Sequence, residues 1–335
     1  MQDIEEISAS DFDSLCLQEF VTVNRQPVVV RGLVNHWPVV VASQRGSEAV
    51  VAMLSDNATS EPCYTVVAAP SENGRLFYSP NLDGVNFKKV GSPLADTLHE
   101  MLKLRHSSAP HAVSIQAASV SAVLPKLKTS HYLEQLDPKI EPSIWVSNRS
   151  RVAAHYDLSD NIACVAAGTR RFTVFPPEQV ANLYVGPTLN SPGGVPISLV
   201  DLHDPDLERF PNFTLALQAA SSALLEPGDG IFIPSPWWHA VDSLEDMNVL
   251  INYWWSDHIS TGQPTAGSSL MLSMLTLAQM NEQQRRAWKA FYDYFVFKVS
   301  GDPAAHLPDT LEDLVTHLSE EQRRACVEFL KQQLS

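Results

Sequence analysis

The stretch "SALLEPGDGIFIPSPWWHAVDSL", Ser222 to Leu244, decides the fold. It consists of short apolar runs separated by turn residues. In "EPGDG" Pro227 presets φ and Gly228 supplies a permissive backbone position, so this segment is a turn by its chemistry. Short runs with turns between them are typical of strands in an antiparallel sandwich or barrel.

The same pattern extends over residues 143–257. Further β-like runs occur there as "SIWVS", "NIACVAA", "RRFTVFPP" and "NVLINYWW". A Pro/Gly-rich insert, Gly186 to Asn212, interrupts these runs, and we expect it to cover one mouth of the barrel. The sequence therefore predicts a barrel or sandwich core at about residues 143–257.

The flanking regions differ from this core. Upstream, "PVVVRGLVNHWPVV" is rich in β-formers and residues 93–106 carry a helical apolar stripe, so residues 1–257 are predicted to form one domain with an N-terminal α/β extension. Residues 258–335 have helical periodicity and no strand alternation. This helical region either packs on the core or forms a homodimer interface, and the two roles are compatible.

Composition excludes several classes of protein. The 335 residues are 44% hydrophobic and 18% charged, which is typical of a folded globular protein, and the net charge of -15 disfavours nucleic acid as a partner. The four cysteines have no zinc-like spacing and suit a reducing compartment. We find no signal peptide and no apolar run long enough to span a membrane, and expect a cytoplasmic protein.

The pattern His155-Tyr156-Asp157 is a candidate half of a metal site. In a strand, residues i and i+2 share a face, so His155 and Asp157 would point the same way. A lone His-x-Asp pattern arises often by chance, and polar residues at a strand end explain it equally well. The interpretation therefore depends on a third ligand from another strand.

His239, in "PSPWWHAVDS", is the candidate third ligand, because it follows a turn, a β run and a proline-bounded bend. Two histidines and one carboxylate on one side of a metal ion leave other positions open, which is the arrangement of non-haem Fe(II) oxygenases. Zinc more often has a closed tetrahedral set, and no thiolate lies near these residues in the sequence. The alternative for His239 is a hydrogen-bonded core histidine.

Several segments in order resemble the JmjC-type cupin-like oxygenases, and among them the asparaginyl hydroxylases. They are "AHYDLSDNIACVAAGTRRFTVFPPEQVANLY", "DPDLERFPNF", "LEPGDGIFIPSPWWHAVDSL" and "NVLINYWW". The resemblance covers about residues 20–257. It implies a mainly β fold with α elements, a double-stranded β-helix of the cupin or jelly-roll type, and a C-terminal helical region that dimerises. It also implies that His155, Asp157 and His239 bind Fe(II), with 2-oxoglutarate as the co-substrate.

The co-substrate also needs a cation for its distal carboxylate. Arg170, Phe172 and Val174 share one face of a predicted strand, which suits an apolar interior with one charge at its rim. Arg170 lies where the family has a lysine, and arginine can hold a carboxylate bidentately. Asn161 and Asn252 match family asparagines near the iron-proximal carboxylate.

Two positions depart from the family. The threonine and tyrosine that help to hold the distal carboxylate correspond to Val152 and Ser114, which we place on the pocket wall. Trp254 is a further candidate for that wall, beside Asn252. In the asparaginyl hydroxylases an Arg-Gln pair faces the target asparagine. The corresponding residues here are Pro196 and Ile197, so the sequence does not predict an asparagine substrate.

The sequence thus predicts an Fe(II)- and 2-oxoglutarate-dependent hydroxylase of a protein side chain or a small metabolite, with no catalytic residue beyond the metal ligands. A metal-binding cupin that does not use 2-oxoglutarate is the second hypothesis, and Val152 and Ser114 favour it slightly. A catalytically silent binding or sensor protein is the third, and the intact triad of possible ligands argues against it.

Overall fold

The turn at Glu226 to Gly230 carries the chain from one β-sheet to another. It joins β12 (Ser221–Leu225), in a six-stranded sheet, to β13 (Gly230–Ile233), in a nine-stranded sheet. Gly228 has a φ of +107°, and a Cβ there would collide with the side chain of Asn35. Only glycine meets both conditions without strain, so the turn chemistry has a structural reason.

The structure is a computed structural model of the chain. It describes residues 1–13, 20–21, 26–188, 191–256, 264–308, 310–311, 313 and 317–334. The chain divides into two compact units, Met1–Ser256 and Asp257–Ser335. Within the described parts of the chain, no helix is long and apolar enough to cross a membrane.

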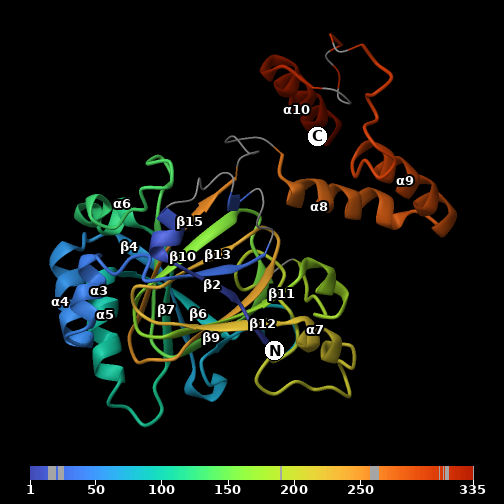
Figure 1. Cartoon of the computed structure of the whole chain (residues 1–335). Helices are drawn as coiled ribbons and strands as arrows, with labels where there is room; N and C mark the ends of the chain where they lie inside the picture. Colours follow the sequence, from blue (N-terminus) through green and yellow to red (C-terminus); the bar gives the residue numbers. More distant parts are fainter. Residues whose placement is uncertain are drawn as a thin grey trace. The chain divides into compact units, whose positions relative to one another are not determined.

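Both sheets of the first unit are mixed, and Figure 1 shows them stacked. The six-stranded sheet has the order β1 (Gln2–Asp3), β12, β11 (Arg170–Phe175), β14 (Trp238–Ser243), β9 (Ser150–Tyr156) and β5 (Arg75–Leu76). The nine-stranded sheet has the order β2 (Glu5–Ser8), β3 (Val28–Arg31), β13, β10 (Asp160–Ala167), β15 (Asn248–Trp255), β8 (Ser143–Ser147), β7 (Ala112–Ser119), β4 (Pro62–Ala68) and β6 (Phe87–Pro93).

From β8 to β15 the chain passes back and forth between the sheets. β8, β10, β13 and β15 lie in the nine-stranded sheet, whereas β9, β11, β12 and β14 lie in the six-stranded sheet. Two sets of four strands that face each other and are connected in this way form the double-stranded β-helix of a jelly roll. The predicted fold class is therefore confirmed, and its strands span residues 143–255.

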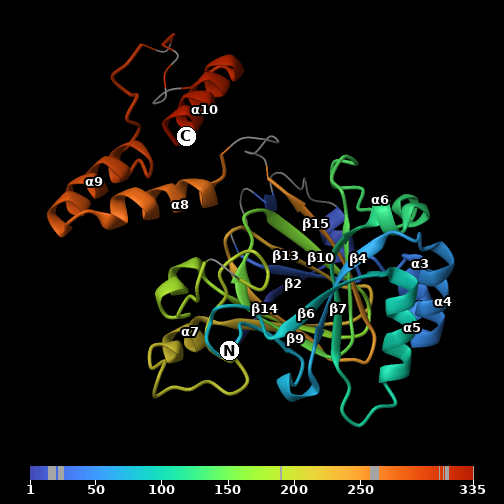
Figure 2. The same cartoon turned by 180° about the vertical axis from the view of Figure 1, so that it is seen from behind.

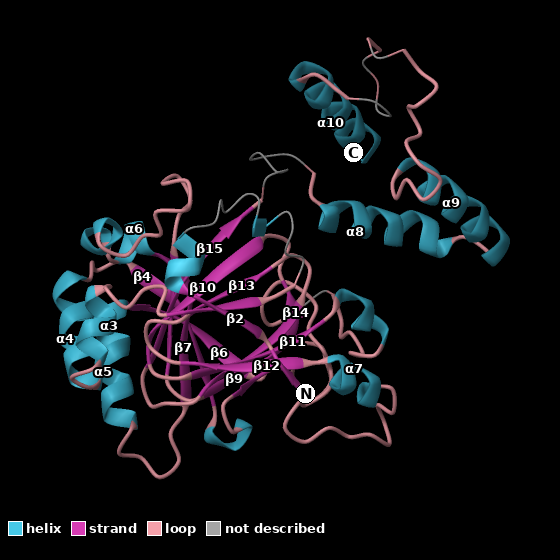
Figure 3. Cartoon of the chain, in the orientation of Figure 1, coloured by secondary structure: helices cyan, strands magenta, loops and turns pink. Residues whose placement is uncertain are grey.

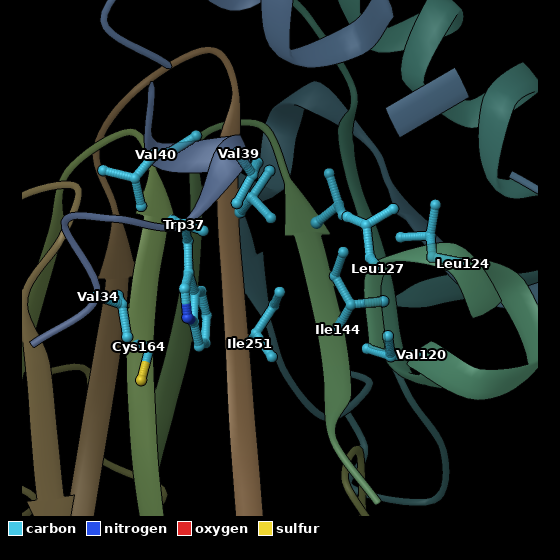
Figure 4. Close-up of a cluster of buried hydrophobic side chains, with 14 of the residues drawn as sticks. Val34, Trp37, Val39, Val40, Val120, Leu124, Leu127, Ile144, Cys164 and Ile251 are labelled. Atoms are coloured by element: carbon cyan, nitrogen blue, oxygen red, sulfur yellow. The ribbon is translucent and has the colours of Figure 1, made fainter. Parts of the chain in front are cut away.

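Helices cover the outer face of the nine-stranded sheet. α3 (Pro38–Ser43), α4 (Ser47–Asn57) and α5 (Leu94–Leu104) lie side by side there in both views (Figures 1 and 2). Figure 4 shows Trp37, Val39 and Val40 of this layer close to Ile251 and Cys164 of the sheet. Burying large apolar side chains stabilises the fold by roughly 1.5–3 kcal/mol each, so this layer anchors the sheet that carries half of the site.

Shorter helices complete the first unit. α1 (Ala9–Asp13) follows β2, α6 (Val120–Val123) follows β7, and α7 (Phe213–Ala219) follows the insert. α7 buries Phe213 and Ala216 against Phe175 and Trp238 on the outer face of the six-stranded sheet. The two sheets are thus each covered on the outside, and the space between them is left for an interior cavity.

The second unit is helical, as Figure 3 shows. Its helices are α8 (Ala266–Thr276), α9 (Glu282–Phe295) and α10 (Glu320–Leu334). The helical periodicity predicted for this region is therefore confirmed for its described residues; residues 258–263, 309, 312, 314–316 and 335 lie outside the described part. None of the described side chains of these helices is fully buried.

Candidate metal centre

The predicted ligands His155, Asp157 and His239 meet at one point between the sheets. His155 lies near the end of β9, Asp157 follows that strand, and His239 lies at the start of β14. β9 and β14 are antiparallel neighbours, and His155 is directly opposite His239 in their register. One ligand atom from each of the three residues lies within 4.8 Å of the others.

Both imidazole rings are fixed by their own strands. Nδ1 of His155 is 2.9 Å from the carbonyl oxygen of Ala153, and Nδ1 of His239 is 3.2 Å from that of Trp237. A carbonyl oxygen only accepts, so Nδ1 of each ring carries the proton and Nε2 keeps its lone pair. This backbone bond is the usual support of a metal-binding histidine.

The electrostatics also suit a cation at this point. Burial and the neighbouring His155 both lower the pKa of His239, so its ring is neutral at neutral pH. Nε2 of His239 lies 3.6 Å from Oδ2 of Asp157, and the two imidazole rings are 4.2 Å apart at their centroids. Three converging donors, one of them a carboxylate, form a site that a divalent metal ion fits.

A hydrogen-bond network extends from Asp157 into the nine-stranded sheet. Trp254 Nε1 donates to Asp157 Oδ2 at 3.0 Å, and Asn161 Nδ2 donates to the same oxygen at 3.5 Å. Asn252 Nδ2 donates to Asn161 Oδ1 at 3.0 Å, and Trp145 Nε1 donates to Asn252 Oδ1 at 2.8 Å. The four hydrogen bonds run in one direction, from Trp145 and Trp254 toward the carboxylate, and they orient Asp157.

Arg170 is a buried cation, although the sequence predicted a position at the rim. It begins β11 and is 6% exposed. Its Nε and Nη2 have no hydrogen-bond partner within the described part of the chain. Burial without a counter-charge lowers the pKa of Arg170 to about 9. An unpaired buried cation is costly, and an anion at this guanidinium would offset that cost.

Arg170 and the three possible ligands line the same cavity of about 180 Å³. Val174, on the same face of β11 as Arg170, pairs with His239 in the register, so the two ends of the cavity are separated by about four residues, or roughly 13 Å along the strand. The wall between them is mostly apolar and includes Phe172, Val241 and Leu250. A slender molecule with an anionic end fits this shape.

The other predicted pocket residues divide into two groups. Asn161, Asn252, Trp254 and Val152 all line the cavity. Ser114, which the sequence places on the same wall, is not among the described residues that line the cavity; it is buried, and its Oγ accepts a hydrogen bond of 2.7 Å from Gln116 Nε2. Gln116 itself is one of the residues that line the cavity.

The insert contributes to the cavity as the sequence predicted. Pro192, Gly193, Val195 and Ile197 are lining residues, and Ile197 pairs with His155 in an isolated bridge. This segment therefore lies beside the end of β9 that carries His155.

Sequence reasoning missed Trp145 and Gln116. The alternation in "SIWVS" puts Trp145 on the face opposite the apolar Ile144 and Val146, together with Ser143 and Ser147. This separate, more polar face could have indicated that Trp145 points into the cavity. Gln116 had no such signal, since its orientation depends on an irregularity in β7.

Comparison with known proteins gives the family. The model of the family described as "Cupin-like domain" matches residues 14–261. The chain is 31% identical over 144 residues to lysine-specific demethylase JMJ31 of Arabidopsis thaliana, which is 42% of this chain and 26% of that protein. It is 31% identical over 153 residues to human HSPB1-associated protein 1, which is 44% of this chain and 30% of the relative.

A third relative is human tRNA wybutosine-synthesizing protein 5, with 31% identity over 145 residues, or 39% of this chain and 43% of the relative. The chain thus spans less than half the length of each of these curated relatives. The family match covers the strands from β3 to β15, the residues that line the cavity and all three possible ligands. The chain therefore belongs to the cupin-like domain family, in agreement with its resemblance to the JmjC-type oxygenases.

Proposed function

We propose that this protein is an Fe(II)- and 2-oxoglutarate-dependent oxygenase that hydroxylates an organic substrate. One observation carries the proposal: the unpaired guanidinium of Arg170 and the His155, Asp157 and His239 triad lie at two ends of one narrow cavity. A dicarboxylate with a metal-binding group at one end would bind the metal with that end and Arg170 with its other carboxylate. The family relationship supports the same function.

The donor set fits ferrous iron. Nε2 of His155, Nε2 of His239 and a carboxylate oxygen of Asp157 would hold the ion on one side. When bound, the iron supplies the activation of dioxygen and the oxidation of 2-oxoglutarate to succinate and carbon dioxide, which side chains cannot perform. The described residues of the cavity include no thiolate, which fits iron better than a structural zinc site.

The side chains of the cavity bind and orient the co-substrate. Arg170 would hold the distal carboxylate with Nε and Nη2, the two donors that have no protein partner. Asn161 and Asn252 line the cavity next to the metal ligands and would orient the proximal carboxylate. The network that ends on Asp157 would keep that ligand in place while these groups bind.

The apolar walls and the insert exclude water. Val152 in β9 and Ile197 in the insert both line the cavity that the co-substrate would fill. Excluding water strengthens the ion pair with Arg170 and protects a reactive site from side reactions. Val152 stands where the family has a threonine, so it packs against the co-substrate without donating a hydrogen bond. The guanidinium of Arg170 would supply the hydrogen bonds to the distal carboxylate instead.

The proposal is tested by incubating the full chain with Fe(II), ascorbate, oxygen and labelled 2-oxoglutarate. We expect slow release of labelled carbon dioxide and succinate, and loss of both in His239→Ala. If 2-oxoglutarate neither turns over nor binds to metal-loaded protein in calorimetry, the protein is a cupin that uses its metal in another way. Val152, which has no hydroxyl, and Ser114, whose hydroxyl is bonded to Gln116, favour that second candidate.

We also propose that the helical unit Asp257–Ser335 mediates a homodimer. α9 has an apolar stripe with Trp288, Phe291 and Phe295 at helical spacing, and these side chains are 45%, 55% and 48% exposed. Exposed aromatic side chains in such a row are typical of a surface that packs against another copy.

A further inference from the structure

Gln116 owes its position to an irregularity in β7. Ile115 pairs with Val146 and Ala118 pairs with Ile144, so Gln116 and Ala117 together face a single residue, Trp145. This is a β-bulge, which redirects a side chain and is often found next to active sites. Ala117 has a φ of +43°, in the left-handed region that a residue with a side chain rarely adopts. Strain of this kind persists where surrounding structure enforces it, and functional sites are common places for it.

The carboxamide of Gln116 is held by its Nε2, which leaves its Oε1 for a ligand. Its Nε2 donates to Ser114 Oγ at 2.7 Å, and Ser114 is buried with 5% exposure. Within the described part of the chain no group donates to Oε1 of Gln116, and the residue lines the cavity. The side chain therefore offers a hydrogen-bond acceptor to whatever enters.

The rest of the cavity is nearly free of charge. Among its described lining residues, the ones with a full charge are Asp157 and Arg170, and the proposed function uses both. Apart from the residues that the proposed function uses, the lining is largely apolar and includes Val66, Leu76, Phe87, Pro192, Val195 and Ile197. A charged group in this part would lose its hydration without gaining a partner.

We propose that Gln116 determines substrate specificity, and that the reacting part of the substrate is an uncharged apolar group with a hydrogen-bond donor that Oε1 of Gln116 accepts. The inference rests on the proposed function, since it assigns to the substrate the part of the cavity that iron and 2-oxoglutarate leave. It selects against the ammonium of an unmodified lysine and against phosphate esters. It favours an aliphatic or aromatic group linked to an amide or a hydroxyl.

Four probes of one carbon skeleton separate these chemistries: isocaproamide, methyl isocaproate, isocaproate and protonated isohexylamine. Each is added to the full chain loaded with Mn(II) and 2-oxoglutarate, and binding near the metal is measured as paramagnetic relaxation of the probe protons by NMR. We expect isocaproamide to bind at least about 10-fold more tightly than either charged probe, because the apolar wall gives them no counter-charge. It should bind about 5-fold more tightly than the ester, which is the size of one hydrogen bond between neutral groups.

Two variants test the role of Gln116 itself. Gln116→Leu should make the amide and the ester bind equally, because the acceptor is gone. Gln116→Glu should reverse the ranking in favour of isohexylamine. Gln218→Glu, the same change at an exposed position on α7, should leave the ranking unchanged.

The proposal is overturned if wild-type protein binds a charged probe as tightly as the amide, or if neither Gln116 variant changes the ranking. The wild-type comparison needs no variant to fold, so it decides the substrate class by itself. Failure of the proposed function is distinguishable, because it appears in calorimetry as absence of 2-oxoglutarate binding before any probe is added.

Discussion

Trp254 donates a hydrogen bond of 3.0 Å from its indole nitrogen to Oδ2 of Asp157. The bond joins the end of β15, in one sheet, to the residue after β9, in the other. It couples the two halves of the jelly roll at the metal centre. Asp157 is 20% exposed at its side chain, so without this donor the carboxylate would be oriented mainly by Asn161.

Replacement of this donor should weaken metal binding. Trp254→Phe keeps an aromatic ring and removes the indole nitrogen, and we expect metal affinity to fall by about 10-fold or more, as is usual for the outer partners of metal ligands. Titration of the metal-free protein with Mn(II), followed by calorimetry, measures the change. Trp288→Phe in α9 is the matched control. Equal affinity in Trp254→Phe and wild type would show that the bond has no part in holding the metal.

Arg170 should control the affinity for 2-oxoglutarate and leave the metal content unchanged. Arg170→Ala removes a buried partner of the distal carboxylate, which typically costs 2–5 kcal/mol, so the Kd should rise at least about 30-fold. Arg170→Lys keeps the charge without the two-pronged geometry and should give an intermediate value.

Arg171→Ala is the control for these variants, because Arg171 is the next residue on β11 and its side chain is exposed. It should bind 2-oxoglutarate like the wild type in calorimetry with Mn(II)-loaded protein. A Kd that is equally unaffected in Arg170→Ala would show that Arg170 does not bind the distal carboxylate of 2-oxoglutarate.

His131 should make the fold less stable in mild acid. It is fully buried under Trp37, where Val39 N–H donates to its Nε2 at 3.3 Å. Burial lowers its pKa from 6.5 to about 4. Above pH 6.5 the ring is neutral in both folded and unfolded chains. As the pH falls toward 4, the unfolded chain takes up a proton that the folded chain does not, so the free energy of unfolding decreases.

The size of this effect follows from the shift in pKa. Between pH 7.5 and pH 5 the loss should be about 2 kcal/mol, at about 1.4 kcal/mol per pH unit below 6.5. Urea unfolding of wild type and of His131→Gln at both pH values isolates it, because glutamine has a donor and an acceptor but does not titrate. If both proteins lose the same stability between the two pH values, His131 is not the group responsible.

The helical unit should control the oligomeric state. Phe291→Asp places a charge in the apolar stripe of α9, and we expect it to convert a dimer to a monomer in light scattering coupled to gel filtration. Ala290→Asp adds the same charge on another face of the helix and should leave the dimer intact. A monomeric wild-type protein would contradict the proposal, and the jelly roll and its cavity do not depend on the outcome.

Alternation and turn chemistry were enough to predict an antiparallel sandwich or barrel, and the resemblance to a family was needed to predict the double-stranded β-helix. The i, i+2 rule placed His155 and Asp157 together, and "EPGDG" marked the turn that moves the chain between sheets. The approach of His239 required the resemblance as well, because no local pattern states that β14 lies beside β9. Strand neighbours of this kind are set by the whole fold.

Three features of the site could not be predicted from local sequence patterns. Arg170 is buried and not at the rim, because the depth of a side chain depends on what packs across from it. Gln116 faces the cavity through a bulge that an alternating pattern does not encode. The side chains of the hydrogen-bond network that ends on Asp157 come from three strands, β8, β10 and β15. The order of these strands follows from sheet topology.

A crystal structure of the full chain with Mn(II) and 2-oxoglutarate under nitrogen tests the central claim most directly. The account predicts one metal ion bound by Nε2 of His155, Nε2 of His239 and a carboxylate oxygen of Asp157, with the distal carboxylate of 2-oxoglutarate on the guanidinium of Arg170. A metal on other residues, or a distal carboxylate away from Arg170, would contradict it.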